Sequence, residues 1–269
     1  MKTIFITGTS SGLGKAAVEL FHSKGWNVIA TMRDVKKAKD FASLERVTVL
    51  PLDITNYEQI EAAVDTIISN FKIDVVLNNA AYGAVGPLES VSDDQLLKQV
   101  NTNLLGAIRV TKAFVPHFRE NGGGLFINVT SIAGLTTFPF NSLYHAVKWG
   151  VEGWSEGMSY ELAPFNIGIK TVAPGYIRTA FGENIAFISS EPYQEMMDHC
   201  MGAIKKMMDP ATQGSTAAQI AGVIYTAATD GEDRVHYTAG ADSAQMYERR
   251  LQIGAEASRK EMSGLFLGK

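Results

Sequence analysis

Tyr144 and Lys148 are the two side chains of this 269-residue chain whose types and spacing first suggest chemistry. They stand four residues apart in a segment with helical periodicity, and positions i and i+4 lie on one face of a helix. Among the nine tyrosines, Tyr144 alone is followed by a lysine at this spacing. Such a pair is also compatible with a simple surface contact, so the neighbouring segments decide its meaning.

A glycine-rich loop follows the first apolar run of the chain. Gly8, Gly12 and Gly14 come directly after Ile4–Thr7, and a helical pattern begins at Lys15. Glycines permit positive φ and close approach of the backbone to a pyrophosphate, which binds at the positive end of the following helix. The spacing is G-x-x-x-G-x-G, and Lys15 lacks the Lys-Ser/Thr pairing of a P-loop. The loop therefore predicts a dinucleotide site and weakens a kinase or NTPase interpretation.

Arg33 is the predicted determinant of the dinucleotide type. About 20 residues after the glycine loop, an acid at the end of the second strand selects NAD, and an arginine accepts a 2′-phosphate. Here Met32 ends the strand and Arg33 follows with a guanidinium suited to phosphate oxygens. We predict NADP(H). In the alternative, Arg33 pairs with Asp34, and Asp34 binds a ribose hydroxyl and favours NAD.

With a nicotinamide cofactor, the tyrosine and lysine suit proton transfer coupled to hydride transfer. Reducing a carbonyl by hydride builds negative charge on its oxygen, which must be protonated as it forms. The ordinary pKa of tyrosine is about 10, and each unit of lowering needs roughly 1.4 kcal/mol of phenolate stabilisation. We predict that Lys148 and oxidised nicotinamide supply it, and that Ser131 donates a hydrogen bond to the carbonyl oxygen.

The elements that must position these residues alternate along the chain. Short β-branched runs predict strands at Thr3–Thr7, Asn27–Thr31, Val47–Pro51, Ile73–Asn78, Leu125–Thr130, Ile167–Val172 and Val235–Thr238. Helical periodicity occupies 12–24, 35–43, 56–71, 93–120, 142–164 and 215–230. This alternation predicts an α/β fold with a doubly wound parallel sheet, a Rossmann fold of three layers, α/β/α. Its ligand then binds at the carboxyl ends of the strands.

Composition favours one domain spanning residues 1–269 and small-molecule chemistry. The net charge of -4 gives no electrostatic reason to bind nucleic acid or an anionic membrane. The single cysteine, Cys200, is expected to be packed, and no His/Cys spacing suggests a metal site. No run is long enough for a signal peptide or membrane span, so we expect a soluble, cytoplasmic protein.

Two segments stand apart from the alternating pattern. The stretch 176–214 lacks a clear strand, is rich in Met and Phe, and is interpreted as a substrate-loop insertion or, equally, as ordinary core. The tail from Ala244 to Lys269 has the pattern of an amphipathic helix whose charges are solvated.

Taken together, these residues resemble the short-chain dehydrogenase/reductase family over essentially the whole chain. The matching motifs, in the family's order, are Thr7-Gly8-x-x-x-Gly12-x-Gly14, Asn78-Asn79-Ala80, Asn103, Ser131, Tyr144-x-x-x-Lys148 and Pro174-Gly175. Tyr-x-x-x-Lys argues against the enoyl-reductase branch, and the length argues against the longer sugar-nucleotide epimerases and dehydratases. The branch that the chain resembles is that of NADP-preferring carbonyl reductases and hydroxysteroid dehydrogenases.

The resemblance implies roles for individual residues. Asn103, Ser131, Tyr144 and Lys148 are the implied catalytic set, in which Asn103 holds a water that links Lys148 to solvent and Lys148 binds the nicotinamide ribose. Asp53 lies near the adenine, Asn79 lines the cleft, and Thr179 lies near the carboxamide. The predicted cofactor-binding residues are Gly8, Ser10, Ser11, Gly12, Leu13, Gly14, Arg33, Asp53, Ile54, Asn79, Ala80, Tyr144, Lys148, Pro174, Gly175, Ile177 and Thr179.

Two positions depart from the family pattern. Ala81 stands where the family usually has a glycine, and we expect the backbone to tolerate its Cβ. Ser11 is not the basic residue that some NADP-preferring members carry, which leaves Arg33 as the main determinant.

The predicted reaction is hydride transfer between NADP(H) and a ketone or aldehyde, or its alcohol, on an apolar or bulky substrate. Tyr82, Phe138, Phe140 and Tyr176 are expected to line the substrate pocket. The alternatives are an NAD-dependent alcohol dehydrogenase and a regulatory protein that senses NADP(H) without turnover, which would have a degraded catalytic set. In the resembling family, the helices near 93–120 and 142–164 pair into homodimers or homotetramers, although they could equally pack within one chain.

Overall fold

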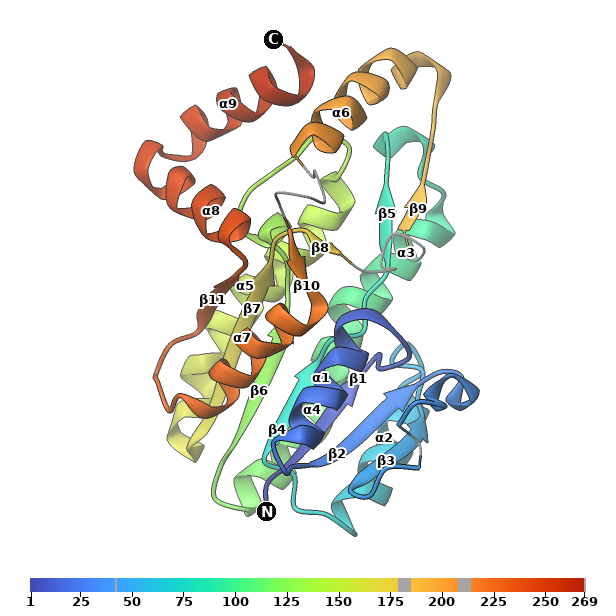
Figure 1. Ribbon diagram of the computed structural model, residues 1–269, viewed down its shortest axis with the longest axis vertical. Coiled ribbons are helices and arrows are strands. Elements are labelled where there is room, and N and C mark those ends of the chain that lie inside the picture. The colour runs from blue at the N-terminus through green and yellow to red at the C-terminus, as the bar shows by residue number, and fades with distance from the viewer. Residues whose placement is uncertain (42, 179–184, 208–213, 269) are drawn as a thin grey trace.

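A seven-stranded sheet forms the centre of the molecule. The computed structural model describes residues 1–41, 43–178, 185–207 and 214–268. The strand order is β11-β7-β6-β4-β1-β2-β3, and every pairing in the sheet is parallel. Order reverses between β1 and β4, as expected of a doubly wound sheet (Figure 1). The predicted fold class is confirmed.

The strands of this sheet begin and end close to their predicted bounds. They are β1 (Thr3–Thr7), β2 (Asn27–Met32), β3 (Val47–Pro51), β4 (Val75–Asn78), β6 (Gly124–Val129), β7 (Ile167–Pro174) and β11 (His236–Ala239). The helices are α1 (Gly12–Ser23), α2 (Tyr57–Ile68), α3 (Asp93–Val100), α4 (Gly106–Glu120), α5 (Ser142–Leu162), α6 (Gln194–Met207), α7 (Ala217–Thr229), α8 (Ala241–Ile253) and α9 (Ala255–Leu267).

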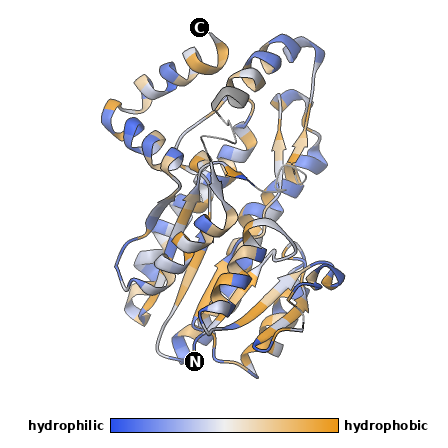
Figure 2. Cartoon of the chain, in the orientation of Figure 1, coloured by the Kyte–Doolittle hydropathy of each residue, from blue (hydrophilic) through white to orange (hydrophobic). Residues whose placement is uncertain are grey.

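Helices cover the sheet on both faces and bury two separate apolar clusters. One cluster joins the strands to α1 and α7, with Phe21, Trp26 and Ile224 among its members. The other joins the strands to α2, α4 and α5 and contains Phe5 and Phe114, whose ring centroids are 4.9 Å apart. Apolar residues concentrate along the central strands, while the helices alternate apolar and polar faces (Figure 2). This burial on both sides explains the continuous apolar runs of the strands.

A smaller assembly stands above the carboxyl edge of the sheet. It contains α6, α8, α9 and two short parallel pairs, β5 (Gly83–Val85) with β9 (Ile185–Phe187) and β8 (Ile177–Arg178) with β10 (Ser215–Thr216) (Figure 1). The interpretation of 176–214 as a segment without strands is therefore wrong, because two- and three-residue pairings leave no periodic signal. Within the described residues, no helix is both long and apolar enough to cross a membrane.

Two predicted helices differ from the structure. In place of a helix over 35–43, the chain makes a short 3-10 helix, Val35–Ala38, which the Asp34 carboxylate caps by accepting from the Lys36 amide. The helix predicted over 93–120 is interrupted by a π-helical turn at Asn101–Leu105, between α3 and α4. A π turn inserts one residue without changing the apolar periodicity enough to be read from sequence.

The C-terminal tail forms two helices where the sequence predicted one. Gly254, with φ of 81°, ends α8 and begins α9, so the chain changes direction there. Arg249 of α8 pairs with Glu261 of α9 across this corner. The expectation that the tail charges are merely solvated is wrong for Arg249.

Phe5 is a direct test of the second cluster. Phe5→Ala removes a ring with no exposed surface that packs on Phe114, so we expect a loss of about 3–5 kcal/mol in the free energy of unfolding. Phe165, which is 45% exposed, is the matched control, and Phe165→Ala should cost less than about 1 kcal/mol. Urea denaturation measures both, and equal losses would contradict the assignment of Phe5 to the core.

Candidate functional site

The glycine loop folds into a cradle that has no room for side chains. Gly8 and Gly12 have φ of 71° and 56°, values that favour glycine. A Cβ on Gly8 would lie 2.7 Å from the Cα of Ala80, and one on Gly14 would lie 2.2 Å from the Gly8 carbonyl oxygen. The loop is thus packed against the residues that follow β4, while Ser10, Ser11 and Gly12 remain accessible to solvent.

Helix α1 begins at this cradle with its first amides free of a side-chain cap. In the part of the chain that the structure describes, no side chain caps α1 at Ser11, and its first turn holds no acid. By contrast, Asn56, Ser92 and Thr216 cap α2, α3 and α7 with their own side chains. Uncapped amides at a helix N-terminus are the groups that bind a phosphate. The cradle and the helix start therefore fit the pyrophosphate of a dinucleotide.

Asn79 fixes the position of the glycine loop. Its amide group donates to the carbonyl oxygens of Thr7, at 2.9 Å, and Gly8, at 3.0 Å. In return, the Thr7 hydroxyl accepts from the backbone amides of Asn79 and Ala80. These bonds tie the end of β1 to the end of β4, so Asn79 positions the cradle in addition to bordering it.

Ser131 and Tyr144 meet at the carboxyl end of β6. Ser131 follows β6, and its side-chain oxygen accepts from the Ala133 amide at 3.1 Å. Tyr144 lies in the first turn of α5, close enough to Ser131 for the serine hydroxyl to lower the pKa of the phenol. Burial raises the pKa of Tyr144 to about 12, and Ser131 opposes part of this rise. The two hydroxyls thus share one point at the sheet edge.

Lys148 lies one helical turn beyond Tyr144 and is 3% exposed. Its ammonium donates to the carbonyl oxygen of Val129 at 3.0 Å and lies 5.8 Å from the centroid of the Tyr144 ring. Burial lowers the pKa of Lys148 to about 8. Without cofactor, the burial of the phenol keeps its pKa high. The lowering predicted from Lys148 together with oxidised nicotinamide concerns the cofactor-bound protein and stays a prediction.

Asn103 reaches the site from the π turn between α3 and α4. Its amide oxygen accepts from the backbone amide of Tyr82 at 2.8 Å, and its amide nitrogen donates to the Tyr82 carbonyl oxygen at 2.6 Å. The side chain therefore holds the segment after β4 beside α5.

Comparison with known proteins places the chain in a family. The family model described as short chain dehydrogenase matches residues 2–187, a range that contains the glycine loop, Ser131 and the Tyr144–Lys148 pair. The chain belongs to the short chain dehydrogenase family. The predicted resemblance is confirmed at the level of the family.

Relatives and solved structures agree with this placement. An uncharacterised oxidoreductase of Schizosaccharomyces pombe is 38% identical over 211 residues, which are 78% of this chain and 88% of the relative. A crystal structure of a short-chain dehydrogenase from Streptomyces avermitilis is 28% identical with a TM-score of 0.85, covering 97% of this chain and 94% of that one. ElxO, solved with NADP bound, is 28% identical with a TM-score of 0.76 over 91% of this chain and 99% of its own.

In this short-chain dehydrogenase, a hollow lies at the ends of β2 and β3, against α2. Arg33 and Asp53 line it together with Leu52 and Gln59. Arg33 is exposed, and no ion pair joins it to Asp34 within the described residues, because Asp34 caps the following turn. Ile54 is buried against Gly106 and contributes packing to this wall. The arrangement favours the interpretation of Arg33 as a ligand-facing cation over the alternative of a pair with Asp34.

Asp242 is a site residue that the sequence did not reveal. Its carboxylate accepts from the backbone amide of Tyr176 at 2.7 Å, and a Cβ on Gly175 would lie 2.2 Å from it. Asp242 belongs to α8, so the C-terminal assembly fixes Gly175 and Tyr176, which follow Pro174 at the end of β7. No local signal marks it, because the contact spans 66 residues. Ile177 continues into β8, and Thr179 lies outside the described residues.

Three of the four aromatic residues predicted to line a substrate pocket contact different parts of the structure. Phe138 packs edge-on against Phe266 of α9, and Phe140, with φ of 60°, packs against Tyr193. Lys98 covers the ring of Tyr82 at 4.2 Å from its centroid. His145, expected to serve packing or solvent, is buried and braces this loop by accepting from Phe138 N and donating to Ala133 O.

Gly14 tests the cradle. In Gly14→Ala, the added Cβ would lie 2.2 Å from the Gly8 oxygen and 2.6 Å from the Asn79 amide nitrogen, so the loop must shift. We expect binding of NADPH, measured by its fluorescence, to weaken at least about tenfold, the equivalent of about 1.4 kcal/mol. Gly153→Ala in α5 meets nothing within 4 Å and is the control, with unchanged affinity and up to about 1 kcal/mol more stability. Unchanged affinity in Gly14→Ala would contradict the assignment.

Proposed function

We propose that this short-chain dehydrogenase is an NADP(H)-dependent carbonyl reductase that acts on apolar or bulky ketones, aldehydes or the corresponding alcohols. The observation that carries the proposal is the meeting of the Ser131 and Tyr144 side chains above the end of β6, with the buried Lys148 one turn away. This set is complete, which argues against a regulatory protein that binds cofactor without turnover.

The bound nicotinamide supplies the hydride in the reducing direction. Ser131 donates a hydrogen bond to the carbonyl oxygen, and Tyr144 gives this oxygen its proton as negative charge develops there. Lys148 binds the nicotinamide ribose and, with Asn103 holding a water, passes a proton back to Tyr144. Because the phenol has a pKa of about 12 in the protein alone, it is a proton donor at rest and needs added positive charge to act as a base.

NADP(H) is the cofactor. The glycine cradle and the uncapped α1 amides fit its pyrophosphate, and Arg33 and Asp53 face the hollow at its adenosine end. The family and the NADP-bound ElxO structure, which shares the fold, support the same cofactor.

Aromatic groups favour an apolar substrate. Phe138 and Phe140 stand in the segment between Ser131 and Tyr144, and their ring partners come from the assembly above the sheet edge. These rings add apolar surface to that segment without offering the polar groups that would recognise a sugar. We also propose that the face of α5 with the exposed Trp149 pairs with a second copy, in a homodimer or homotetramer.

Tyr144→Phe tests the catalytic role. The variant keeps the ring and loses the proton donor, so we expect NADPH oxidation with a ketone to fall at least about a hundredfold while NADPH affinity stays within about twofold. Tyr160→Phe, at a tyrosine that is 72% exposed on the same helix, is the control and should retain wild-type rates. Wild-type turnover in Tyr144→Phe would overturn the proposal.

Arg33→Ala tests the cofactor preference. Loss of the guanidinium should raise the KM for NADPH at least about tenfold, with little change in the KM for NADH, because only NADPH carries the 2′-phosphate. Lys37→Ala removes an equal charge from an exposed residue nearby and should leave both values unchanged. Equal effects of Arg33→Ala on the two cofactors would assign a different role to Arg33.

A further inference from the structure

Glu152 is a buried carboxylate that the proposed reaction does not use. It lies on α5 one turn beyond Lys148, so Tyr144, Lys148 and Glu152 follow one another along the same stripe of the helix. Glu152 is 5% exposed, and Lys148 is 3% exposed. Burying a carboxylate is costly unless hydrogen bonds and an opposite charge compensate for its lost hydration.

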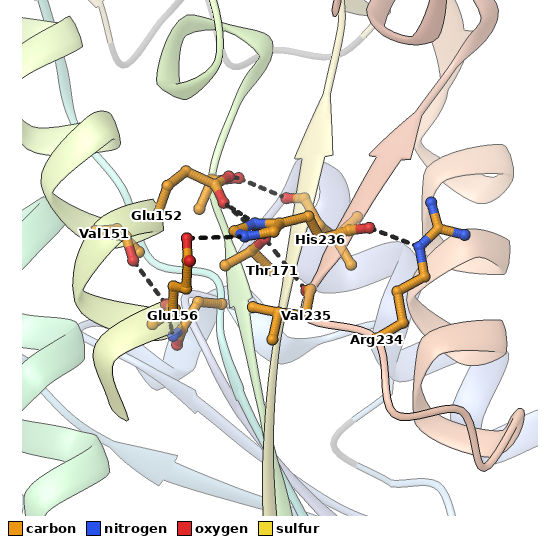
Figure 3. A network of polar contacts seen from close by, with 11 residues as sticks. Val151, Glu152, Glu156, Thr171, Arg234, Val235 and His236 are labelled. Atoms are coloured by element: carbon orange, nitrogen blue, oxygen red, sulfur yellow. Dashed lines mark hydrogen bonds and ion pairs between the residues drawn. The ribbon is translucent and has the colours of Figure 1, made fainter. Parts of the chain in front are cut away.

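Three strands supply hydrogen bonds to this carboxylate. The hydroxyl of Thr130, directly after β6, donates to one oxygen, and the hydroxyl of Thr171 in β7 donates to the other at 2.7 Å. Nδ1 of His236 in β11 lies 2.8 Å from the second oxygen (Figure 3). The carboxylate is thereby held rigidly, with donors on both oxygens.

Lys148 and Glu152 are also linked through β6. The ammonium of Lys148 bonds the carbonyl oxygen of Val129, and the carboxylate of Glu152 bonds the next residue, Thr130. Gly134 allows this turn of α5 to approach, since a Cβ there would lie 3.0 Å from the Lys148 oxygen and 3.1 Å from Cγ of Glu152. Burial lowers the pKa of Lys148, and the charge of Glu152 opposes that lowering.

The other charged groups around Glu152 are directed elsewhere. Glu156 is exposed and approaches Nε2 of His236 at 3.5 Å, and Asp233 borders the same surface hollow as His236. Arg234 donates to the His236 carbonyl oxygen (Figure 3). Its guanidinium also stacks on Tyr237. Beside Thr171, Lys170 points to the opposite face of the sheet and pairs with Asp230. His236 bonds the Glu152 carboxylate directly, and this bond raises the pKa of its imidazole, although the His236 side chain is partly exposed. On the α5 face, Lys148 is the fully buried cation that the same carboxylate can stabilise.

We propose that the Glu152 carboxylate is the counter-charge that keeps Lys148 in its ammonium form, which makes Glu152 a positioning residue for proton transfer at Tyr144. Its effect on turnover rests on the proposed function. Its effect on the charge of Lys148 does not, because that concerns the protein without cofactor or substrate.

Titration of Lys148 by NMR in the cofactor-free protein tests the inference. Lysine labelled with ¹³C at Cε separates Lys148, with its lowered pKa, from exposed lysines, and the Lys148→Met protein assigns the signal. Glu152→Gln keeps the shape and removes the charge, so the pKa of Lys148 should fall by about one unit or more. Glu156→Gln, an exposed glutamate near the same histidine, is the matched control and should leave that pKa unchanged.

Glu152→Asp keeps the charge farther from Lys148, so the pKa of the lysine should lie between those of the wild type and the glutamine variant. An unchanged pKa of Lys148 in folded Glu152→Gln overturns the proposal. Should the glutamine variant fail to fold, the aspartate variant decides, and a lysine pKa equal to that of the wild type overturns the proposal.

The pH profile of kcat then tests the positioning role. In Glu152→Gln, the alkaline loss of activity should begin at a lower pH, by the same interval as the change in the pKa of Lys148, and should stay in place in Glu156→Gln. If the pKa of Lys148 falls but the alkaline loss of activity stays at the same pH, Glu152 is not a positioning residue for the reaction. Its role as the counter-charge of Lys148 would still hold. If kcat shows no alkaline loss of activity and Tyr144→Phe is fully active, the proposed function itself is contradicted.

Discussion

The contact between the first turns of α5 and the carboxyl end of β6 is the interaction on which the site depends. Lys148 bonds the last residue of β6, Tyr144 meets Ser131 directly beyond it, and His145 braces the loop that joins the two elements. Gly134 leaves the space for α5 to come this close. A buried parallel strand and a helix with one reactive stripe thereby place a phenol, a hydroxyl and an ammonium at one point.

Burial has opposite effects on the two titrating groups at that point. It raises the pKa of the Tyr144 phenol and lowers that of the Lys148 ammonium, so each neutral form is favoured. The phenol is thus protonated at neutral pH, and the lysine loses its proton far more easily than an exposed lysine. The network around Glu152, at the next turn of α5, counteracts the effect on Lys148. The groups that set the charge of Lys148 therefore extend from the sheet edge to His236 in β11.

Much of this arrangement could be predicted from sequence because it depends on local patterns. The β-branched runs predict the strands of the large sheet. The cradle is predicted by the order of strand, glycine loop and helix between Thr3 and Ser23. The spacing of Tyr144 and Lys148 gives their common face without further information. Ser131 follows from its place after a buried strand, since parallel strands end at one edge.

The features that the sequence did not predict depend on contacts between residues distant in sequence or on very short helices and strands. Asp242 reaches Tyr176 from a helix 66 residues away, and the pairing of β5 with β9 involves three residues of each strand. Apolar periodicity passes through the π turn that carries Asn103 and through the corner at Gly254 without a break. Glu152 had a local signal, because it stands four residues after Lys148. The residues that bond its carboxylate are distant in sequence: Thr171 is 19 residues away and His236 is 84 residues away.

The central claim is that the hydroxyls of Tyr144 and Ser131 face the bound nicotinamide. A crystal structure of the chain with NADP⁺ and an alcohol ligand tests this most directly. We expect the nicotinamide ring beside these two residues, with the ligand oxygen at about 2.7 Å from both hydroxyls and the pyrophosphate on the amides of Gly12–Gly14. A nicotinamide ring ordered elsewhere, or a Tyr144 hydroxyl turned away from it, would contradict the account.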